Sequence, residues 1–357
     1  MNKVHNFSAG PCILPNEVFK EAADSMLNFN NLNLSLIEIS HRSKDFVEVM
    51  EEARQLVRDI LAVPDNYEVL FLQGGASLGF LTTAYNMMRS NKAGGYLVTG
   101  AWAKKAAKEA AFMGESITIA SSEDKNFNYI PKNLDINNNI DYFHVTSNNT
   151  IFGTQIKDFY TGSTPLVCDM SSDIFSRKID VSNFDIIYAG AQKNMGPAGT
   201  TLYIFNKDII GKSSVPIPTM LNLKTHADKD SMFNTPPVFA VYASMLTLRW
   251  LQKNGGINNI EKKNEEKANL IYNEIDRNSL FDGTANKYDR SNMNATFVLN
   301  NDVLKADFDE MLAKANISGL KGHRSVGGYR ASMYNALGIE SVQTLVNIMK
   351  ELETKKA

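Results

Sequence analysis

A single lysine, Lys193, lies in a setting that suits covalent chemistry. It follows the apolar run FDIIYAG (184–190), and IYAGAQKNMGPAGT (187–200) surrounds it with glycine, alanine, asparagine and proline. Burial or cationic neighbours lower the pKa of a lysine, and an uncharged amine is a nucleophile that bonds to carbonyl compounds. An ordinary lysine that reaches solvent from a loop fits the same letters. Other residues must therefore decide between the two interpretations.

Further polar or aromatic residues follow other apolar runs. Asp169 ends TPLVCD (164–169), where a carboxylate serves either as a cap for the next turn or as the partner of a protonated pyridine nitrogen. Trp102 follows GYLVTG (95–100) and suits stacking on a flat ring or packing against a sheet. The stretch QGGASLGF (73–80) is typical of a strand-to-helix turn that binds phosphate, although glycines also occur in such turns for geometric reasons.

Two short segments share the order histidine, arginine, serine. They are SHRSK (40–44) and GHRSV (322–326), and a further arginine follows in GYRAS (328–332). Guanidinium groups bind carboxylate and phosphate through paired hydrogen bonds, and a neighbouring imidazolium adds charge. For any one segment, solvated loop charge is the alternative. Taken as a set, these segments favour a substrate with two anionic ends.

Seven short apolar runs position these residues, and helix-like segments lie between the runs. The predicted strands are 67–73, 95–100, 115–120, 141–146, 164–169, 184–190 and 200–205. This alternation predicts an α/β fold, in which a mainly parallel seven-stranded sheet is covered by helices and binds ligands beyond the carboxyl ends of its strands. After residue 260 the pattern predicts a smaller α+β domain. We therefore expect a large cofactor-binding domain at 16–260 and a small domain at 1–15 and 261–357.

The composition narrows the class of partner. The 357 residues carry 37 basic and 39 acidic side chains, so no overall field favours nucleic acid or a membrane surface. No apolar run approaches the roughly 18 residues of a spanning helix, and the first residues lack the apolar core of a secretory signal. Two cysteines, Cys12 and Cys168, suggest neither a disulfide framework nor a metal site. We predict a cytoplasmic protein with a small-molecule substrate and no metal.

These motifs together resemble the phosphoserine aminotransferases, which are pyridoxal-phosphate enzymes of the aspartate-aminotransferase fold type. The likeness extends over nearly the whole chain, and its motifs are long and chemically unusual. They include FSAGP (7–11), SHRS (40–43), GGAS (74–77), CDMSSDIFSRKIDV (168–181), NTPPVFAVY (234–242) and GHRSVGGYRASMYNA (322–336).

The resemblance implies a role for each of these sites. Lys193 would carry pyridoxal 5′-phosphate as an aldimine and move the proton at the substrate Cα. The other cofactor-binding positions would be Ala76, Ser77, Trp102, Thr150, Asp169, Gln192, Asn234 and Thr235, the last two supplied by a second subunit of a homodimer. The substrate-binding positions would be His41 and Arg42 of the neighbouring chain, together with His323, Arg324 and Arg330.

The implied substrates are small anionic amino acids and keto acids. The reaction would be a ping-pong transamination from L-glutamate to 3-phosphooxypyruvate, which gives O-phospho-L-serine and 2-oxoglutarate in serine biosynthesis. Alternatives are the phosphorylated hydroxythreonine keto acid of vitamin B6 synthesis, a lyase of the same fold such as a cysteine desulfurase, and a phosphate-binding protein without catalysis. Gly79, Asn149 and Lys178 depart from the family's pattern, and we expect them to affect affinity rather than reaction type.

Overall fold

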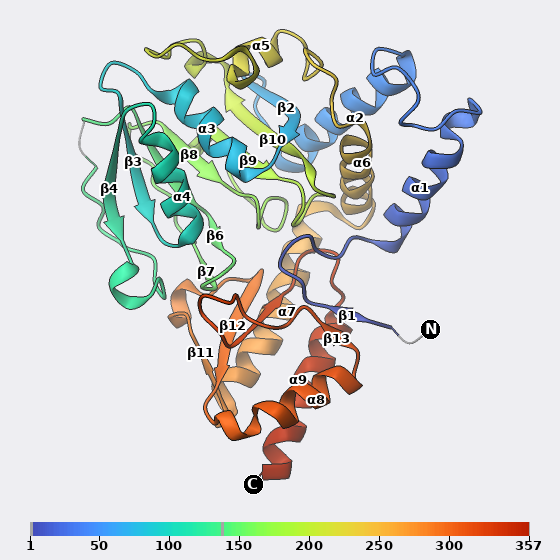
Figure 1. Ribbon diagram of the computed structural model, residues 1–357, viewed down its shortest axis with the longest axis vertical. Coiled ribbons are helices and arrows are strands. Elements are labelled where there is room, and N and C mark those ends of the chain that lie inside the picture. The colour runs from blue at the N-terminus through green and yellow to red at the C-terminus, as the bar shows by residue number, and fades with distance from the viewer. Residues whose placement is uncertain (1–2, 137–138, 357) are drawn as a thin grey trace.

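The computed structural model describes residues 3–136 and 139–356, which form a large part above a small part in Figure 1. A seven-stranded sheet runs through the large part. In spatial order its strands are β2 (Tyr67–Gly74), β10 (Gly199–Asn206), β9 (Ile186–Gly190), β8 (Leu166–Asp169), β5 (Tyr142–Thr146), β3 (Ala93–Val98) and β4 (Glu115–Ser121). Only β10 runs antiparallel to its neighbours in this sheet. The predicted mainly parallel seven-stranded sheet is confirmed.

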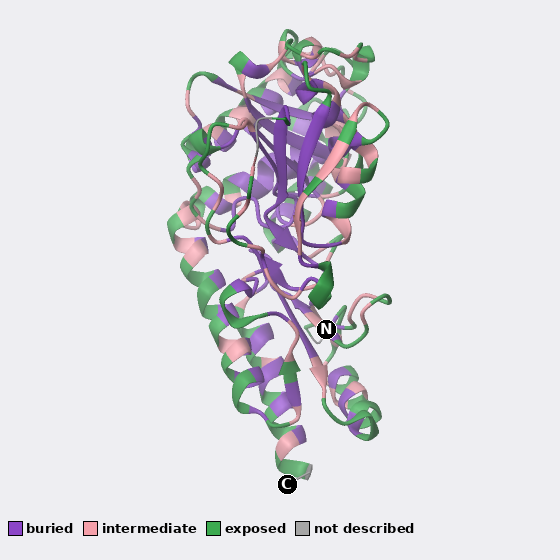
Figure 2. Ribbon diagram, turned by 90° about the vertical axis from the view of Figure 1, so that its left-hand side faces the viewer, coloured by how far each residue is buried: buried purple, intermediate pink, exposed green. Residues whose placement is uncertain are grey.

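Helices cover both faces of this sheet because its strands are apolar on both sides. In β2, Leu70 and Leu72 join one core, whereas Val69 and Phe71 join the core on the opposite face, as the alternation of side chains along a strand requires. The first core contains α3 (Ala76–Met87) and α4 (Ala101–Ala110), and the second contains α1 (Asn16–Leu27), α2 (Lys44–Leu61) and α6 (Val238–Lys253). Figure 2 shows the buried residues concentrated in the strands and on the inner helix faces.

The small part is a three-stranded antiparallel sheet packed against helices. The chain enters it through α7 (Gly256–Arg277), after Gly255 adopts a φ of 89° and separates α7 from α6. Its sheet has the order β11 (Phe281–Gly283), β12 (Asn294–Leu299), β14 (Tyr329–Ser332), and its other helices are α8 (Lys305–Lys314) and α9 (Ile339–Lys356). Near the start of the chain, β1 (His5–Asn6) pairs in parallel with β13 (Ile317–Ser318). The N-terminal segment therefore packs with the small part.

Short elements connect these layers. They are β6 (Asn148–Asn149), β7 (Thr154–Gln155), α5 (Leu223–Ala227) and the 3₁₀ turns Phe29–Asn31, Glu123–Lys125, Val181–Asn183, Lys207–Ile209, Thr219–Leu221, Lys287–Asp289 and Asp302–Leu304. Within residues 3–136 and 139–356, no helix has the length and apolar character needed to cross a membrane. The same residues contain no group of three or more His, Cys, Asp or Glu side chains suited to a metal ion.

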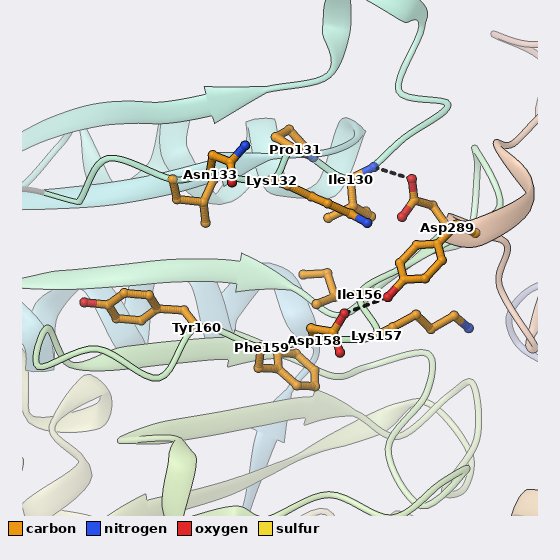
Figure 3. Close-up of a pocket in the computed structure, with 12 residues that line it drawn as sticks. Ile130, Pro131, Lys132, Asn133, Ile156, Lys157, Asp158, Phe159, Tyr160 and Asp289 are labelled. Atoms are coloured by element: carbon orange, nitrogen blue, oxygen red, sulfur yellow. Dashed lines mark hydrogen bonds between the residues drawn. The ribbon is translucent and has the colours of Figure 1, made fainter.

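A cavity of about 280 Å³ lies where the two parts meet (Figure 3). At its edge the Tyr288 hydroxyl donates to Asp158 Oδ2 (2.8 Å), and the backbone N–H of Ile130 donates to Asp289 Oδ2 (3.1 Å). These two hydrogen bonds join the small part to the large part. None of the predicted site residues lines this cavity, so it lies apart from the predicted site.

Candidate active site

Asp169 and Lys193 lie at the same edge of the large sheet. β8 and β9 are parallel neighbours, and Asp169 lies opposite Tyr188 in their register. Lys193 follows in the lysine turn (residues 191–195), which links β9 to β10 and is closed by a hydrogen bond from Gly196 N to Ala191 O (2.9 Å). Because the carboxyl ends of parallel strands meet at one edge, the acid and the amine face a common region.

The environment of Lys193 favours the uncharged amine. Although the residue keeps partial exposure, desolvation by burial lowers the pKa of its ammonium group, and the charge of Arg330 lowers it further, while Asp169 opposes the shift. The N-terminal segment packs against this lysine. A Cβ atom added at Gly10 would lie 3.3 Å from Lys193 Cγ, and Cys12 N donates to Gln192 O (3.2 Å). The amine is therefore held in a confined site.

Asp169 is 4% exposed, and one of its carboxylate oxygens is occupied. Oδ1 accepts hydrogen bonds from the backbone N–H (2.9 Å) and the hydroxyl (2.6 Å) of Ser171. Burial raises the pKa of the carboxyl group, whereas the Ser171 hydrogen bonds and the Lys193 charge oppose that rise. Among the described residues no hydrogen bond reaches Oδ2. Asp169 thus caps a turn through one oxygen and leaves the other oxygen for a cationic partner.

Hydrogen bonds join three segments that are distant in the sequence, which contain Trp102, Thr150 and Arg330. Trp102 lies in the first turn of α4, and its Nε1 donates to Thr150 Oγ1 (3.2 Å). From β14 in the small part, Arg330 Nη1 donates to the carbonyl of Thr150 (3.1 Å). The Nζ atom of Lys193 lies 5.5 Å from the centroid of the Trp102 ring. An aromatic face, an amine and a guanidinium therefore border one site.

The N-terminus of α3 faces open space. Ala76 and Ser77 lie in its first turn, and the N-cap residue, Gly75, has no side chain that could cap the helix. A Cβ atom added at Gly75 meets nothing within 4 Å, whereas one added at Gly190 would lie 2.9 Å from Gln192 Oε1 and 3.1 Å from Ala76 N. Gln192 and the start of α3 therefore converge. Free N–H groups and the helix dipole favour an anion at such a position, and the residues present fit a phosphate group.

His323 and Arg324 precede β14 in an exposed glycine-rich turn. His323 Nδ1 lies 2.6 Å from Ser325 Oγ. Burial lowers the pKa of the His323 imidazole, and the positive charges of Arg330, Arg324 and Lys105 lower it further. A group of cationic side chains therefore surrounds one side of the site, and such a group suits an anionic substrate.

Sequence reasoning missed two residues of this site. Lys105 places its Nζ atom 4.4 Å from the centroid of the Trp102 ring. The sequence could have indicated this contact, because Lys105 lies three residues after Trp102 on the same helix and residues with that spacing are neighbours. The Ser171 hydroxyl accepts from Gly190 N (3.0 Å) while it donates to Asp169. The signal for that contact was a serine two residues after an acidic residue in a turn.

Four predicted residues are not brought together with Lys193 in this chain. Among the described residues, no hydrogen bond or ion pair joins His41 or Arg42 to Lys193, and Arg42 is exposed. The buried Nε2 atom of His41 has no hydrogen-bond partner there. Asn234 and Thr235 are also exposed, in the bend before α6. Their positions leave them available to a second copy of the chain.

Both cysteine thiols are held in the protonated form. Cys168 is fully buried in β8, and desolvation raises the pKa of its thiol well above the ordinary value. Burial also raises the pKa of Cys12 to about 12. The thiolate is the nucleophilic form, so neither residue is suited to the cysteine chemistry of a desulfurase.

Two of the three departures from the family's pattern have structural reasons. A Cβ atom added at Gly79 would lie 2.6 Å and 2.9 Å from two atoms of the Tyr188 ring, so glycine lets α3 pack on β9. Asn149 is buried and donates to Thr99 Oγ1 (3.1 Å) and Thr154 Oγ1 (3.0 Å), which fixes the turn that contains Thr150. Nothing in the structure explains Lys178, which is exposed.

Comparison with known proteins agrees with this geometry. The family described as aminotransferase class-V matches residues 4–345. Phosphoserine aminotransferase of Flavobacterium psychrophilum is 63% identical over 354 residues, and that of Porphyromonas gingivalis is 53% identical over 360 residues, with 99% of both chains covered in each case. The chain belongs to the class-V aminotransferases, and within them to the phosphoserine aminotransferases. The recognition made from the sequence motifs is confirmed.

Solved structures of this family superpose on this chain over nearly its whole length. Phosphoserine aminotransferase from Bacillus circulans subsp. alkalophilus has a TM-score of 0.96 at 40% identity and covers 99% of both chains. The enzyme from Trichomonas vaginalis, solved with pyridoxal phosphate bound, has a TM-score of 0.91 at 36% identity and covers 98% of this chain and 100% of its own. The large sheet and the small part therefore keep the arrangement found in known members.

Proposed function

We propose that this aminotransferase transfers the amino group of L-glutamate to 3-phosphooxypyruvate and so forms O-phospho-L-serine and 2-oxoglutarate. One observation carries the proposal: the Lys193 amine and the Asp169 carboxylate share a sheet edge, with the Trp102 ring beside the amine and the Arg330 guanidinium close by. A transaminase needs an amine, an acid, an aromatic face and a carboxylate site in this relation.

The residues fit pyridoxal 5′-phosphate as the cofactor. Lys193 would attach it, Asp169 Oδ2 would face its ring nitrogen, and Trp102 would stack on its ring. Thr150 would bind its phenolic oxygen, and the start of α3, together with Gln192, would hold its phosphate. When bound, this cofactor supplies an electron sink for the pair of electrons left when a proton departs from the substrate Cα.

The chain's own groups then act on protons and charges. Lys193 Nζ takes the proton from the substrate Cα, and its lowered pKa shifts the amine toward the uncharged form, which is the form that accepts a proton. A positioned base of this kind contributes about 10²–10⁴-fold to the rate. Asp169 lies where a positive charge must be stabilised, and its hydrogen bonds from Ser171 fix its orientation and favour its charged form against the effect of burial.

Two cationic regions match the two anionic ends of the substrates. Arg330, which is oriented by Thr150, would bind the α-carboxylate that glutamate and phosphoserine share. His323 and Arg324 would bind the distal carboxylate or phosphate. Because both substrates present two anions, one site accommodates each of them in turn, as a ping-pong transamination requires.

A homodimer would complete the site. His41 and Arg42 would extend the distal anion site of a second subunit, and Asn234 and Thr235 would reach its cofactor phosphate. The exposure of Arg42, Asn234 and Thr235 supports this assignment. Exposed apolar side chains in the same regions also support a subunit contact, because they gain from being covered; they are Phe19, Leu27, Leu34, Ile37, Phe233 and Phe239.

Subunit complementation tests the shared site. Lys193→Ala and Arg42→Ala homodimers should each be impaired, but mixing and re-forming dimers should restore activity, because roughly a quarter of the sites then contain both intact residues. Activity that stays at the level of the separate variants would contradict residue sharing.

The domain limits and the compartment are further proposals. We assign residues 16–260 to the large domain and residues 1–15 and 261–357 to the small domain. Pairing of β1 with β13 supports placing the N-terminal segment in the small domain. The proposed boundary after residue 260 falls within α7. The two free cysteines are compatible with the proposed cytoplasmic location.

Direct assay of both half-reactions tests the function. The purified chain, loaded with pyridoxal 5′-phosphate, should change its visible absorption on addition of glutamate and should form phosphoserine when 3-phosphooxypyruvate follows. Lys193→Ala is the negative control. A spectral change with glutamate but no phosphoserine would overturn the substrate assignment, and the phosphorylated hydroxythreonine keto acid would be assayed next.

A further inference from the structure

Three buried asparagines join the elements that carry the predicted catalytic and binding residues. Asn194 directly follows Lys193, Asn335 lies five residues after Arg330, and Asn264 lies in α7. Their residues are 6%, 8% and 1% exposed, respectively. Buried amide side chains require hydrogen-bond partners, so their contacts fix how these elements sit against one another.

Asn335 lies at the centre of this network. Its backbone N–H donates to Asn194 Oδ1 (2.9 Å), and its Nδ2 donates to the carbonyl of Phe175 (2.9 Å). Its Oδ1 accepts from Asn264 Nδ2 (2.9 Å). One residue of the small part therefore contacts the lysine turn, the loop that follows Asp169, and helix α7.

The other two asparagines hold the same loop. Asn194 Nδ2 donates to the carbonyl of Ile174 (2.7 Å), and Asn264 Nδ2 donates to the carbonyl of Ser176 (3.0 Å). Together with the Asn335 contact, three successive carbonyls at 174–176 each accept from a different asparagine. The loop cannot shift relative to the lysine turn without leaving buried polar groups unpaired.

A lysine of α7 fixes the segment that follows β14. Lys267 is 2% exposed, and its Nζ donates to the carbonyls of Met333 and Tyr334, each at 2.9 Å. Residues 333–335 are therefore anchored to α7 and to the lysine turn at the same time. Since β14 ends at Ser332, this anchored segment sets the end of the strand that carries Arg330.

We propose that Asn335 is a positioning residue for the transamination, because it holds the Arg330 guanidinium at a fixed distance from the Lys193 amine. This inference rests on the proposed function. The substrate is held by its α-carboxylate at Arg330, and the proton on its Cα must meet Lys193 Nζ. A misplacement of about 1 Å between such groups lowers a rate by about 10²-fold.

Asn335→Ala tests the proposal, with Asn278→Ala as the matched control. Asn278 is 2% exposed, and its side chain makes hydrogen bonds within the small part to Glu274, Met349 and Leu280. Both variants lose buried hydrogen bonds, so both should lower Tm. Only Asn335→Ala should reduce kcat, by about 10²-fold, and raise KM for glutamate.

Hydrogen–deuterium exchange of the cofactor-free chain gives a measurement that does not depend on turnover. In Asn335→Ala the backbone N–H still donates to Asn194, whereas the side-chain hydrogen bonds to Phe175 and Asn264 are lost. Peptides covering 174–177 and 333–337 should therefore exchange faster in Asn335→Ala and stay at the wild-type rate in Asn278→Ala. Asn335→Asp keeps the acceptor for Asn264 and loses the donor to Phe175. If Asn335→Ala does not fold, Asn335→Asp is measured in its place, and we expect the same peptides to exchange faster.

Two outcomes overturn the inference. One is a variant with lowered Tm whose kcat and KM stay within about twofold of wild type, since Asn335 would then be structural only. The other is unchanged exchange in the peptide that covers 174–177, where the carbonyl of Phe175 loses its donor. Failure of the wild-type chain to form phosphoserine would instead refute the proposed function, so the two failures are distinguishable.

Discussion

The guanidinium of Arg330 is oriented before any substrate arrives. β14 pairs Arg330 with Thr296 of β12, and Nη1 is held by the carbonyl of Thr150 (3.1 Å). The Nε atom is buried and has no hydrogen-bond partner among the described residues. A carboxylate that enters the site therefore meets a donor that is already desolvated and aimed, and it relieves the cost of an unpaired buried N–H group.

Arg330→Lys should weaken this recognition although the positive charge is retained. Lysine lacks the planar pair of donors that matches a carboxylate. Loss of one hydrogen bond to a charged group costs about 1.5–3 kcal/mol, and each 1.36 kcal/mol corresponds to a tenfold change in rate. We therefore expect kcat/KM for glutamate to fall by about 10- to 150-fold.

Steady-state kinetics with both amino-acid substrates provides the assay. Glutamate and phosphoserine share the α-carboxylate, so kcat/KM should fall by a similar factor for each. Arg277→Lys is the control, since Arg277 pairs with Glu274 and Glu353 away from the site, and it should stay within about twofold of wild type. A loss confined to phosphoserine would place Arg330 at the distal anion, and a loss below about threefold would refute the reasoning.

Three further changes have defined outcomes. Lys193→Ala should abolish turnover and the imine absorbance of the loaded enzyme, and retention of both would remove Lys193 from the mechanism. Gly79→Ala should lower the free energy of unfolding by about 1–3 kcal/mol, because its Cβ would lie 2.6 Å from the Tyr188 ring; an unchanged denaturation midpoint would contradict this. Burial lowers the pKa of His144 from 6.5 to about 3, so its contribution to stability is present above pH 6.5 and is lost as the pH falls toward 3. Between pH 7 and pH 5 the free energy of unfolding of wild type should therefore fall by about 2 kcal/mol more than that of His144→Gln. Urea denaturation at the two pH values measures this difference, and equal decreases would show that His144 does not titrate in this way.

Much of the fold followed from hydrophobic patterning, but one strand direction did not. The seven predicted strands all lie in the large sheet, because each is a short apolar run and the sheet is buried on both faces. A hydrophobic pattern is the same whichever way the strand runs, so it could not show that β10 runs antiparallel to β2 and β9. The reversal follows from the short connection through the lysine turn, which leaves no room for a crossover helix.

Residues at strand ends were predictable, whereas residues that support them were not. Asp169 and Lys193 follow apolar runs, so their common edge could be inferred from the alternation of strands and helices. Ser171 and Asn335 act through hydrogen bonds to backbone groups in distant segments, and the spacing of polar residues does not specify such partners. In the proposed homodimer, the positions of His41 and Arg42 relative to a site would depend on a second chain, which no local pattern describes.

The charges around Lys193 also suggest how substrate binding prepares the proton transfer. Arg330 lowers the pKa of the Lys193 ammonium, and Asp169 raises it. In the proposed site, a substrate carboxylate bound at Arg330 would neutralise that positive charge, so the affinity of the amine for a proton would rise when the Cα proton is presented to it. In the proposed site the same guanidinium would therefore hold the substrate and adjust the base, so the distance that we propose Asn335 to maintain would affect the rate as well as the affinity.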